Sequence, residues 1–522
     1  MFTRTVSKAL SLPSADHTVG WWRLYFGIRT VAEPVARFVG VRSESKSGSA
    51  GNHISYPQLV AALLVGFALR LFFIFYRPFW SGDTRFYEEL ASNWLYHGAY
   101  GLYINSHLTA VHMRAPGYPA FLAGIYAVFG QSRLPVMIIQ AVLDLVTCLL
   151  VARIATKLAP APIRQRAATA ALWMAVLCPF TANYTAAILT ESLATFLTIA
   201  AVLILVTILT DVSIDNPPDA LDRRALLLRA GSWLLAGFVV GLGTLVRPET
   251  PLLLIATGLF LLVHWRHRAD WSKLALAGLW MSVGMLLPLA PWAARNARTL
   301  GRVEFIAPRY AESYGDFVPR GFFAWTGTWM VRFQDAYRVT WKLGNAPIYS
   351  GTLPGTAFDS DAERARVASL LAQYNSNLKI PPALDQKFAL LARQRTAEHP
   401  LRSYIFIPFD RAFRIWFTPR IELLPFSGKL WPPGEMRRSS PIDFNVTATF
   451  GILNIIFVAL ACVGAWKCRK NPGLALLLTV LAVRTAFTTQ LQTVEPRYVI
   501  ECYPAILAIG ALAWLKWPIG VN

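Results

Sequence analysis

Residues 79–98 have the sequence Phe-Trp-Ser-Gly-Asp-Thr-Arg-Phe-Tyr-Glu-Glu-Leu-Ala-Ser-Asn-Trp-Leu-Tyr-His-Gly and directly follow the first long apolar run of the chain. Phe86, Leu90 and Trp94 recur at helical spacing, and polar side chains occupy the opposite face. This pattern predicts a short amphipathic helix in the headgroup region of a membrane, ended by Gly98. Asp83 stands at its start, where it is either a helix N-cap or a catalytic group.

The composition is that of a membrane protein with several spans. The 522 residues are 55% hydrophobic and 15% charged, whereas about a quarter of the residues of a soluble domain are charged. The net charge of +21 indicates loops held on the cytoplasmic side, and no basic-aromatic groove suggests nucleic acid as a partner. The five cysteines show neither a disulfide framework nor a metal-binding pattern.

Apolar runs near the ~20 residues that cross a bilayer define the expected spans. The run Pro116–Gly130 is too short to count as one, and we expect it to be interfacial or re-entrant. Leaving it out places four short basic loops on the side of the basic N-terminus, as the positive-inside rule requires. Both termini are then cytoplasmic. The ten expected spans are 57–76, 134–152, 167–187, 190–210, 229–246, 250–265, 273–292, 445–466, 473–489 and 499–517.

The expected topology puts charged residues at the outer ends of five spans. Charges at membrane depth are costly and usually mark a site, so five such ends on one side predict one lined cavity. Arg70, Asp144 and Arg484 lie inside spans and receive no role. The charged ends are Asp83, Thr190-Glu191, Arg247-Pro248-Glu249, Pro291 to Asn296 and Glu495-Pro496-Arg497-Tyr498.

Four regions follow from this division. Residues 1–56 form a basic cytoplasmic tail with a possible interfacial helix, and residues 297–443 form the one large segment on the outer side. We therefore expect an all-α polytopic membrane protein with about ten transmembrane helices and an extracytoplasmic α/β or mixed soluble domain. The transmembrane core comprises 57–296, which includes an outer loop at 77–133 with juxtamembrane helices, and the C-terminal transmembrane helices of 444–522.

The outer loop and the span ends resemble the membrane-embedded GT-C glycosyltransferases. Within that superfamily the similarity is to protein O-mannosyltransferases, the aminoarabinose transferase of lipid A and bacterial RgtA-like family 39 enzymes. Each matching piece is weak alone, and their order and spacing over residues 57–517 carry the resemblance. The pieces are Gly82-Asp83 with Tyr87 and Ala91, Arg114 to Pro119, Leu189 to Leu193, Leu245 to Glu249, Pro291-Trp292 with Arg295-Asn296 and Gly301, His399-Pro400, and Glu495 to Tyr498.

The resemblance implies transfer of a sugar from a polyprenyl-phosphate donor to a protein, lipid or polysaccharide acceptor on the extracytoplasmic face. Such a reaction needs a base at the acceptor hydroxyl and cations at the departing phosphate. Asp83 is our candidate for the base and Glu191 for a second catalytic acid, and the two together are a candidate site for a divalent metal ion. Arg497, Arg295, Arg247 and Arg114 are the candidates for phosphate binding, and Tyr87, Glu249, Tyr498 and Glu495 for other pocket residues.

Plainer interpretations stand beside these. Glu191 opens a span, where a carboxylate suits the positive end of the helix dipole, and an arginine at a span end commonly snorkels to the interface. For the whole chain, the alternative is a secondary transporter or a flippase of lipid-linked sugars, which usually shows paired repeats that this sequence lacks. The basic, uninterrupted membrane core suggests a bacterial host. In that case we expect a bacterial inner membrane, a site on the periplasmic or extracellular side, and undecaprenyl phosphate as the lipid.

Overall fold

The computed structural model describes residues 56–211, 223–265, 271–307, 317–491 and 493–516. The possible interfacial helix of the N-terminal tail lies outside these residues. Within the described part, five helices are long and apolar enough to cross a membrane, which makes this an integral membrane protein. They are α2 (Tyr56–Tyr76), α5 (Arg133–Leu158), α8 (Glu191–Asp211), α11 (Trp271–Leu300) and α18 (Pro441–Lys467).

The expected count of ten spans is not confirmed, and two of the other apolar runs form interrupted helices. The run 167–187 divides into α6 (Arg164–Val176) and α7 (Pro179–Tyr184), and Pro179 occupies the first turn of the second helix, where its missing N–H does no harm. The run 499–517 begins as the 3₁₀ helix η5 (Pro496–Cys502) and continues as α20 (Tyr503–Gly510). The remaining helices are α9 (Arg223–Val246), α10 (Leu252–Trp265) and α19 (Pro472–Thr488).

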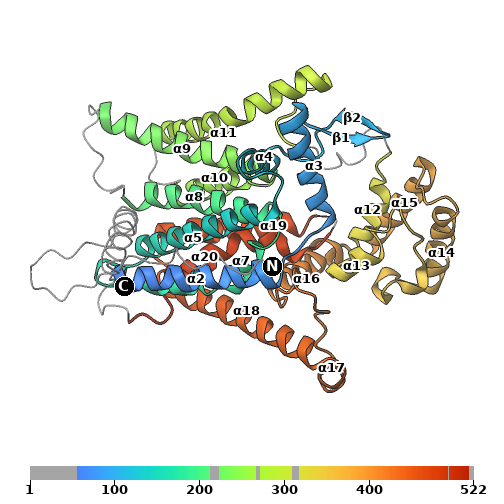
Figure 1. Cartoon of the computed structure of the whole chain (residues 1–522). Helices are drawn as coiled ribbons and strands as arrows, with labels where there is room; N and C mark the ends of the chain where they lie inside the picture. Colours follow the sequence, from blue (N-terminus) through green and yellow to red (C-terminus); the bar gives the residue numbers. More distant parts are fainter. Residues whose placement is uncertain (1–55, 212–222, 266–270, 308–316, 492, 517–522) are drawn as a thin grey trace, which may run out of the picture.

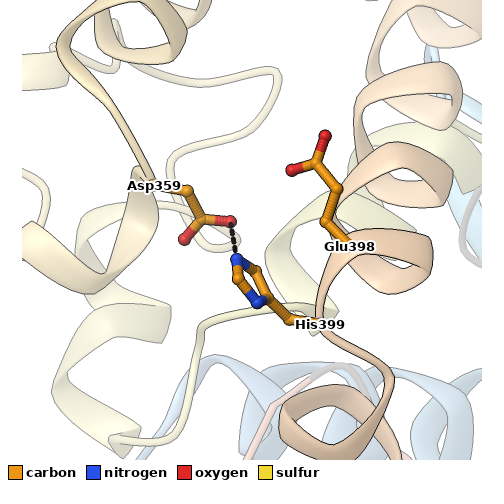
Figure 2. A group of neighbouring side chains, drawn as sticks. All are labelled: Asp359, Glu398 and His399. Carbon is orange, nitrogen blue, oxygen red and sulfur yellow. Dashed lines mark ion pairs between the residues drawn. The ribbon is translucent and has the colours of Figure 1, made fainter.

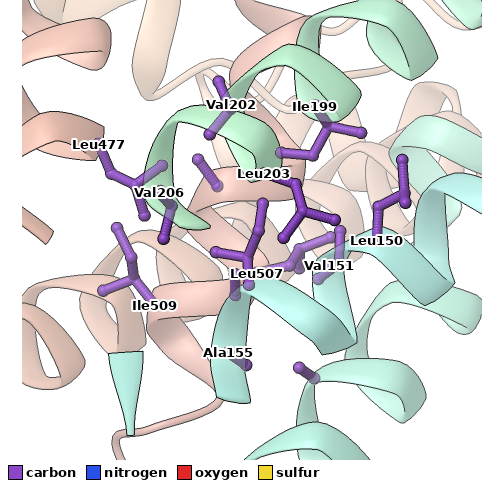
Figure 3. Close-up of a cluster of buried hydrophobic side chains, with 14 of the residues drawn as sticks. Leu150, Val151, Ala155, Ile199, Val202, Leu203, Val206, Leu477, Leu507 and Ile509 are labelled. Atoms are coloured by element: carbon purple, nitrogen blue, oxygen red, sulfur yellow. The ribbon is translucent and has the colours of Figure 1, made fainter. Parts of the chain in front are cut away.

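The core of the bundle lies where α5, α8, α19 and α20 meet. The packed side chains are aliphatic and buried, so helices from the first and the last thirds of the chain share one interior. Burial of such side chains away from lipid and water fixes the helices by close packing. Figure 3 shows Leu150 and Val151 of α5, Ile199, Val202 and Val206 of α8, Leu477 of α19, and Leu507 and Ile509 of α20.

The outer loop folds as the sequence predicts around its amphipathic helix, α3 (Gly82–His97). Ser81 is the N-cap, its backbone N–H donates to Thr84 Oγ1 (3.1 Å), and Gly98 ends the helix at φ 65°. The side chain of Asp83 is thereby left for other contacts. A hairpin that the sequence analysis did not predict follows, with strands β1 (Gly101–Ile104) and β2 (His107–Ala110) in antiparallel register. Asn105 and Ser106 form its two-residue turn with φ of 49° and 65°, the signature of a tight hairpin.

The short apolar run after the hairpin forms α4 (Gly117–Phe129), a 13-residue helix, as expected for a segment that does not span. Its first residue packs closely on the C-terminal end of α9. A Cβ atom at Gly117 would lie 2.6 Å from the carbonyl oxygen of Leu245, so only glycine permits this approach. The contact holds the N-terminus of α4 beside the end of α9.

Every regular element within residues 317–443 is a helix, so the expected α/β or mixed domain is wrong there. Aromatic residues alternate with small or polar ones in the run Phe322 to Trp329, but Phe322, Trp325 and Trp329 recur at helical spacing and are all buried. Helical periodicity, with Phe388 packed against Phe322 and Trp325, decides the structure. The elements are α12 (Arg320–Gly327), α13 (Phe333–Arg338), η2 (Ser350–Thr352), η3 (Gly355–Ala357), α14 (Asp361–Asn375), α15 (Pro382–Glu398), η4 (Arg402–Phe406), α16 (Ile407–Trp416) and α17 (Pro433–Ser439).

The two ends of the bundle differ in their loops. Helices α12, α14 and α15 gather at the end that also carries α3 and the hairpin (Figure 1). Arg133, at the start of α5, donates to Glu88 of α3 (2.6 Å), which fixes that end of α5 beside the outer loop. The other end of α5 lies roughly 39 Å away by helix geometry. There the side chain of Asn471 donates to the carbonyl oxygens of Lys157 and Leu158 (3.0 and 3.2 Å), so the basic loop after α5 and the basic loop before α19 lie together.

Candidate active site

The backbone between α7 and α8 positions the start of α3. Phe79 donates its backbone N–H to the carbonyl oxygen of Ala186 (3.1 Å), and Thr84 Oγ1 donates to that of Ile188 (3.1 Å). Ala186 and Ile188, whose carbonyl oxygens accept these hydrogen bonds, lie within five positions of Glu191. The two links therefore bring the first outer loop against the start of the third long span, and Asp83 beside Glu191.

Asp83 lies between two arginines from distant parts of the chain. Its Oδ1 accepts from Arg114 Nη2 (3.0 Å), and its Oδ2 accepts from Arg497 Nη1 and Nη2 (3.3 and 3.2 Å). Burial opposes ionisation of this carboxyl, but the guanidinium groups of Arg497 and Arg114 outweigh it and lower the pKa of Asp83 below its usual value. The three side chains are 21–25% exposed, so they remain open to a ligand.

Glu191 lies beside Arg497 and is only 2% exposed, so it is more deeply buried than Asp83, Arg114 and Arg497. Its Oε1 is 3.8 Å from Arg497 Nη1 and 3.5 Å from Arg247 Nη1. One carboxylate therefore connects the arginine that contacts Asp83 to an arginine at the end of α9. In this position Glu191 orients Arg497 and does not itself face the open side of the site.

The charged network continues into the bundle through residues that the sequence analysis left partly unassigned. Arg247 Nε contacts Glu249 Oε1 (2.9 Å) and Glu501 Oε1 (3.2 Å). Arg484 Nη2 contacts the same two oxygens at 3.2 and 3.0 Å. Glu501 is absent from our predicted site, although an acid inside an apolar run is a signal of a buried role. The two acids and two arginines neutralise one another, which is the condition for burying charge.

Glu495 and Tyr498 flank Arg497 on its own segment. Glu495 Oε2 accepts a short hydrogen bond from Arg497 Nε, and Glu495 Oε1 accepts from the Tyr498 hydroxyl (2.9 Å). A further residue missed from the sequence, Arg420, donates to the carbonyl oxygen of Pro496 (2.5 Å), to that of Ile415 and to the Tyr503 hydroxyl. Its φ of 60° lies in the left-handed region, a strain of about 1–3 kcal/mol. Arg420 thereby fixes the backbone that precedes Arg497.

Tyr87 packs edge-on against Tyr118, with ring centroids 5.1 Å apart. Burial raises the pKa of Tyr87 to about 12, and the nearby Asp83 carboxylate acts in the same direction. The hydroxyl therefore stays protonated at neutral pH. Tyr87 lies within the electrostatic field of Asp83 and can supply a hydrogen bond, but not a base.

Arg295 is the one phosphate candidate that the described contacts place away from the carboxylate network. Its Nη1 donates to the carbonyl oxygen of Val111 (2.9 Å) and its Nη2 to that of Tyr100 (2.6 Å). The guanidinium also lies 5.1 Å from the Trp292 ring centroid, a cation–π arrangement. These contacts fasten the hairpin to the end of α11.

The geometry between Asp83 and Glu191 does not suit the predicted divalent metal ion. Both carboxylates face the guanidinium of Arg497, which occupies the place that a cation would take. Metal binding there would require Arg497 to leave. We therefore derive no chemical step through a metal ion.

A second cluster of possible metal ligands lies among the helices of residues 317–443 and consists of Asp359, Glu398 and His399, whose ligand atoms lie within 4.8 Å of one another. His399 Nε2 is 3.9 Å from Asp359 Oδ2 (Figure 2). Both oxygens of Asp359 already accept from Arg402 (2.6 and 2.7 Å), and these hydrogen bonds lower the pKa of Asp359. The salt bridge with Arg402 thus neutralises the carboxylate of Asp359, and this neutralisation requires no metal ion.

No protein-family model and no curated protein sequence matches the chain. Among solved structures, the chain is similar to the oligosaccharyltransferase AglB of Archaeoglobus fulgidus. In a complex with Zn and sulfate, the identity is 14% and the TM-score 0.45, and the match covers 87% of this chain and 48% of that one. In a complex with an inhibitory peptide and a dolichol phosphate, they are 13% and 0.44. The chain thus spans about half the length of these proteins.

The chain is also similar to ArnT of Cupriavidus metallidurans bound to undecaprenyl phosphate. The identity is 15% and the TM-score 0.37, and the match covers 88% of this chain and 77% of that one. AglB and ArnT are both membrane glycosyltransferases of the GT-C superfamily, the group that the sequence motifs resemble. With TM-scores below 0.5, no residue role passes from these proteins to this chain.

Proposed function

We propose that the protein is an integral-membrane inverting glycosyltransferase that moves a sugar from a polyprenyl-phosphate donor to an acceptor hydroxyl on the extracytoplasmic face. The observation that carries the proposal is the carboxylate of Asp83 held between Arg114 and Arg497. The carboxylate and the two guanidinium groups lie together and are partly exposed, and α3, which carries Asp83, lies at the same end of the bundle as α12, α14 and α15 (Figure 1). The sequence motifs that contain these residues support the same chemistry.

The proposed reaction forms one bond and breaks one bond at the anomeric carbon. The acceptor oxygen bonds to that carbon from the face opposite the phosphate, and the carbon–oxygen bond to the phosphate breaks with its electron pair going to the phosphate oxygen. Asp83 accepts the hydroxyl proton. The added negative charge of the departing polyprenyl phosphate is met by Arg497 and Arg114, whose planar groups match phosphate oxygens.

The ion pairs of Asp83 with Arg114 and Arg497 give donor binding a second effect. While Arg114 and Arg497 contact Asp83, the carboxylate is a weak base. Donor phosphate competes for both guanidinium groups, and their shift toward the phosphate returns the pKa of Asp83 toward its usual value. The donor thereby prepares the base that acts on the acceptor.

One assay tests this proposal against the alternative of a transporter or flippase. Purified protein is incubated with a radiolabelled polyprenyl-phosphate sugar and a crude envelope fraction as acceptor, and release of polyprenyl phosphate is measured. We expect release with the native protein and release that is slower by about 10²–10⁴-fold with Asp83→Asn. A transporter would move the intact donor across a vesicle membrane and release no polyprenyl phosphate, and that result would refute the proposal.

A further inference from the structure

We propose that an apolar groove between α16, α18, α19 and α20 binds the isoprenoid chain of the lipid donor. This inference rests on the proposed function and adds to it the place where the tail of the substrate lies. The groove has a volume of about 630 Å³, within the ~300–1,000 Å³ of typical ligand sites. Its walls are lined mainly by Ala412, Trp416, Ala461, Cys462, Ala482 and Ile509.

The groove has the length and the polarity of a site for one amphiphile. Its lining on α19 and the turn that follows extends from Leu478 to Gln490, roughly 18 Å at the helical rise, which is close to half of the ~30 Å hydrocarbon core. Aliphatic side chains line the end near Leu478. The other end has Thr485, Thr489 and Gln490, where Gln490 Nε2 donates to Thr489 Oγ1 (3.2 Å). One end therefore suits hydrocarbon and the other suits a headgroup.

The wall formed by η4 and α16 indicates that the groove opens to lipid. Leu401, Ile405, Phe409, Phe413 and Phe417 recur every four residues and are 43–70% exposed. The opposite side of the same helix is buried through Ile407 and Ile415. A stripe of large apolar side chains on one edge of a helix is typical of a segment in the interface of a membrane. The groove lies beside this stripe, since Pro408 and Ala412 belong to both the helix and the lining.

The polar end of the groove is close to the proposed active site along the chain. Arg497 follows Gln490 by seven positions, a distance of at most about 25 Å even if fully extended. Arg411 of α16 donates to the carbonyl oxygen of Thr489 (2.7 Å), so that helix is fastened to this end of the groove. A phosphate at Arg497 and Arg114 can therefore place its isoprenoid chain in the groove.

The cysteines provide a direct probe of occupancy. Cys462 lines the groove and is exposed, whereas Cys148, Cys178, Cys468 and Cys502 are buried. The rate of maleimide labelling of Cys462 is measured on the full-length protein in detergent. At ten times its Kd, undecaprenyl phosphate should slow labelling about tenfold by mass action, while inorganic phosphate and phosphatidylglycerol leave the rate unchanged. Labelling that undecaprenyl phosphate does not slow, or that phosphatidylglycerol slows equally, would overturn the proposal.

A matched pair of substitutions tests the same groove through kinetics. Ala482 of α19 is exposed and lines the groove, and Ala459 of α18 is exposed outside it. Ala482→Trp should raise the donor KM about tenfold for a long-chain donor and leave a ten-carbon donor unaffected, because only the long chain needs the groove. Ala459→Trp should change neither. Equal kinetics for the two variants would refute the groove.

The two failures are distinguishable. If the unaltered protein transfers no sugar, the proposed function fails, and lipid protection of Cys462 is still measured separately. If transfer occurs while Cys462 labelling and the kinetics of Ala482→Trp are unchanged, the groove alone is refuted.

Discussion

Asp83 and Arg497 lie 414 positions apart in the sequence, yet both terminal nitrogens of Arg497 donate to the same oxygen of Asp83 at 3.2 and 3.3 Å. The contact joins the first outer loop to the segment before the last helix. Neither plainer interpretation of these residues describes it, because Ser81 caps the helix and Arg497 is turned inward to a carboxylate. The ion pair between Asp83 and Arg497 is partly exposed, so a ligand can reach it. Buried neighbours such as Glu191 hold its side chains in place.

The first prediction concerns the proposed base. Asp83→Asn should lower kcat by about 10²–10⁴-fold, the usual contribution of general acid–base catalysis, while the protein still binds polyprenyl phosphate. Glu89→Gln on the same helix is the matched control, because Glu89 accepts from the backbone of Tyr103 (2.8 Å) and lies outside the network. Release of polyprenyl phosphate measures kcat, and equal rates for native protein and Asp83→Asn would remove Asp83 from the reaction.

The second prediction is the pH dependence of kcat/KM, which reports the free enzyme. The pKa of Asp83 is lowered in the folded protein, so its acid limb should fall below the ordinary value of about 4. Arg497→Ala removes one cation and should move that limb to higher pH. The sign for stability follows the same shift: the ion pairs stabilise the fold above about pH 4 and lose this effect as pH falls through the lowered pKa.

This pH prediction has a counterpart for the donor complex. If donor phosphate draws the arginines away from Asp83, the acid limb of kcat lies at higher pH than that of kcat/KM. Coincident limbs in the native protein would contradict the proposed exchange of partners, and an unmoved limb in Arg497→Ala would contradict the electrostatic assignment.

The third prediction distinguishes Arg497 from Arg295, since the sequence alone made both of them candidates for phosphate binding. Arg497→Ala should raise the donor KM by about tenfold to a hundredfold, because a hydrogen bond to a charged group contributes about 1.5–3 kcal/mol. Arg295→Met should leave donor KM unchanged and instead increase hydrogen exchange over residues 100–111, since Arg295 binds the carbonyl oxygens of Tyr100 and Val111. A raised donor KM in Arg295→Met would return that residue to the phosphate site.

The fourth prediction concerns metal ions. Arg497 lies between the carboxylates of Asp83 and Glu191, so dialysis against EDTA should leave the rate of transfer unchanged. The rate is measured before and after dialysis, and again after addition of Mg²⁺, Mn²⁺ or Zn²⁺. Activity that is lost with EDTA and restored by one ion would show that the metal displaces Arg497 in the working state.

Local patterns predicted the two helices of the outer loop, but not the hairpin between them. The spacing of Phe86, Leu90 and Trp94 indicated α3, and Gly98 ends that helix with φ 65°. The length of the run after the hairpin indicated a short helix at α4. In both cases the determining forces act between neighbours in sequence, where periodicity and capping are informative.

Contacts between distant segments decided the rest. Glu501 was missed because the sequence does not show that Arg247 and Arg484 both reach it. The backbone carbonyl oxygens that bind Arg295 and Arg420 are likewise invisible before the chain is folded. The aromatic run at Phe322 to Trp329 was ambiguous in period, and packing against Phe388 resolved it as a helix.

The contact of Gly117 with the carbonyl oxygen of Leu245 makes the site sensitive to a residue that carries no charge and faces no substrate. Arg114 precedes this glycine by three positions, and Arg247 follows that leucine by two. An added methyl group would wedge the two backbones apart and draw one guanidinium away from Asp83 while the other stayed with Glu191. The alignment of the donor would then depend on the close contact between the first residue of α4 and the C-terminal end of α9.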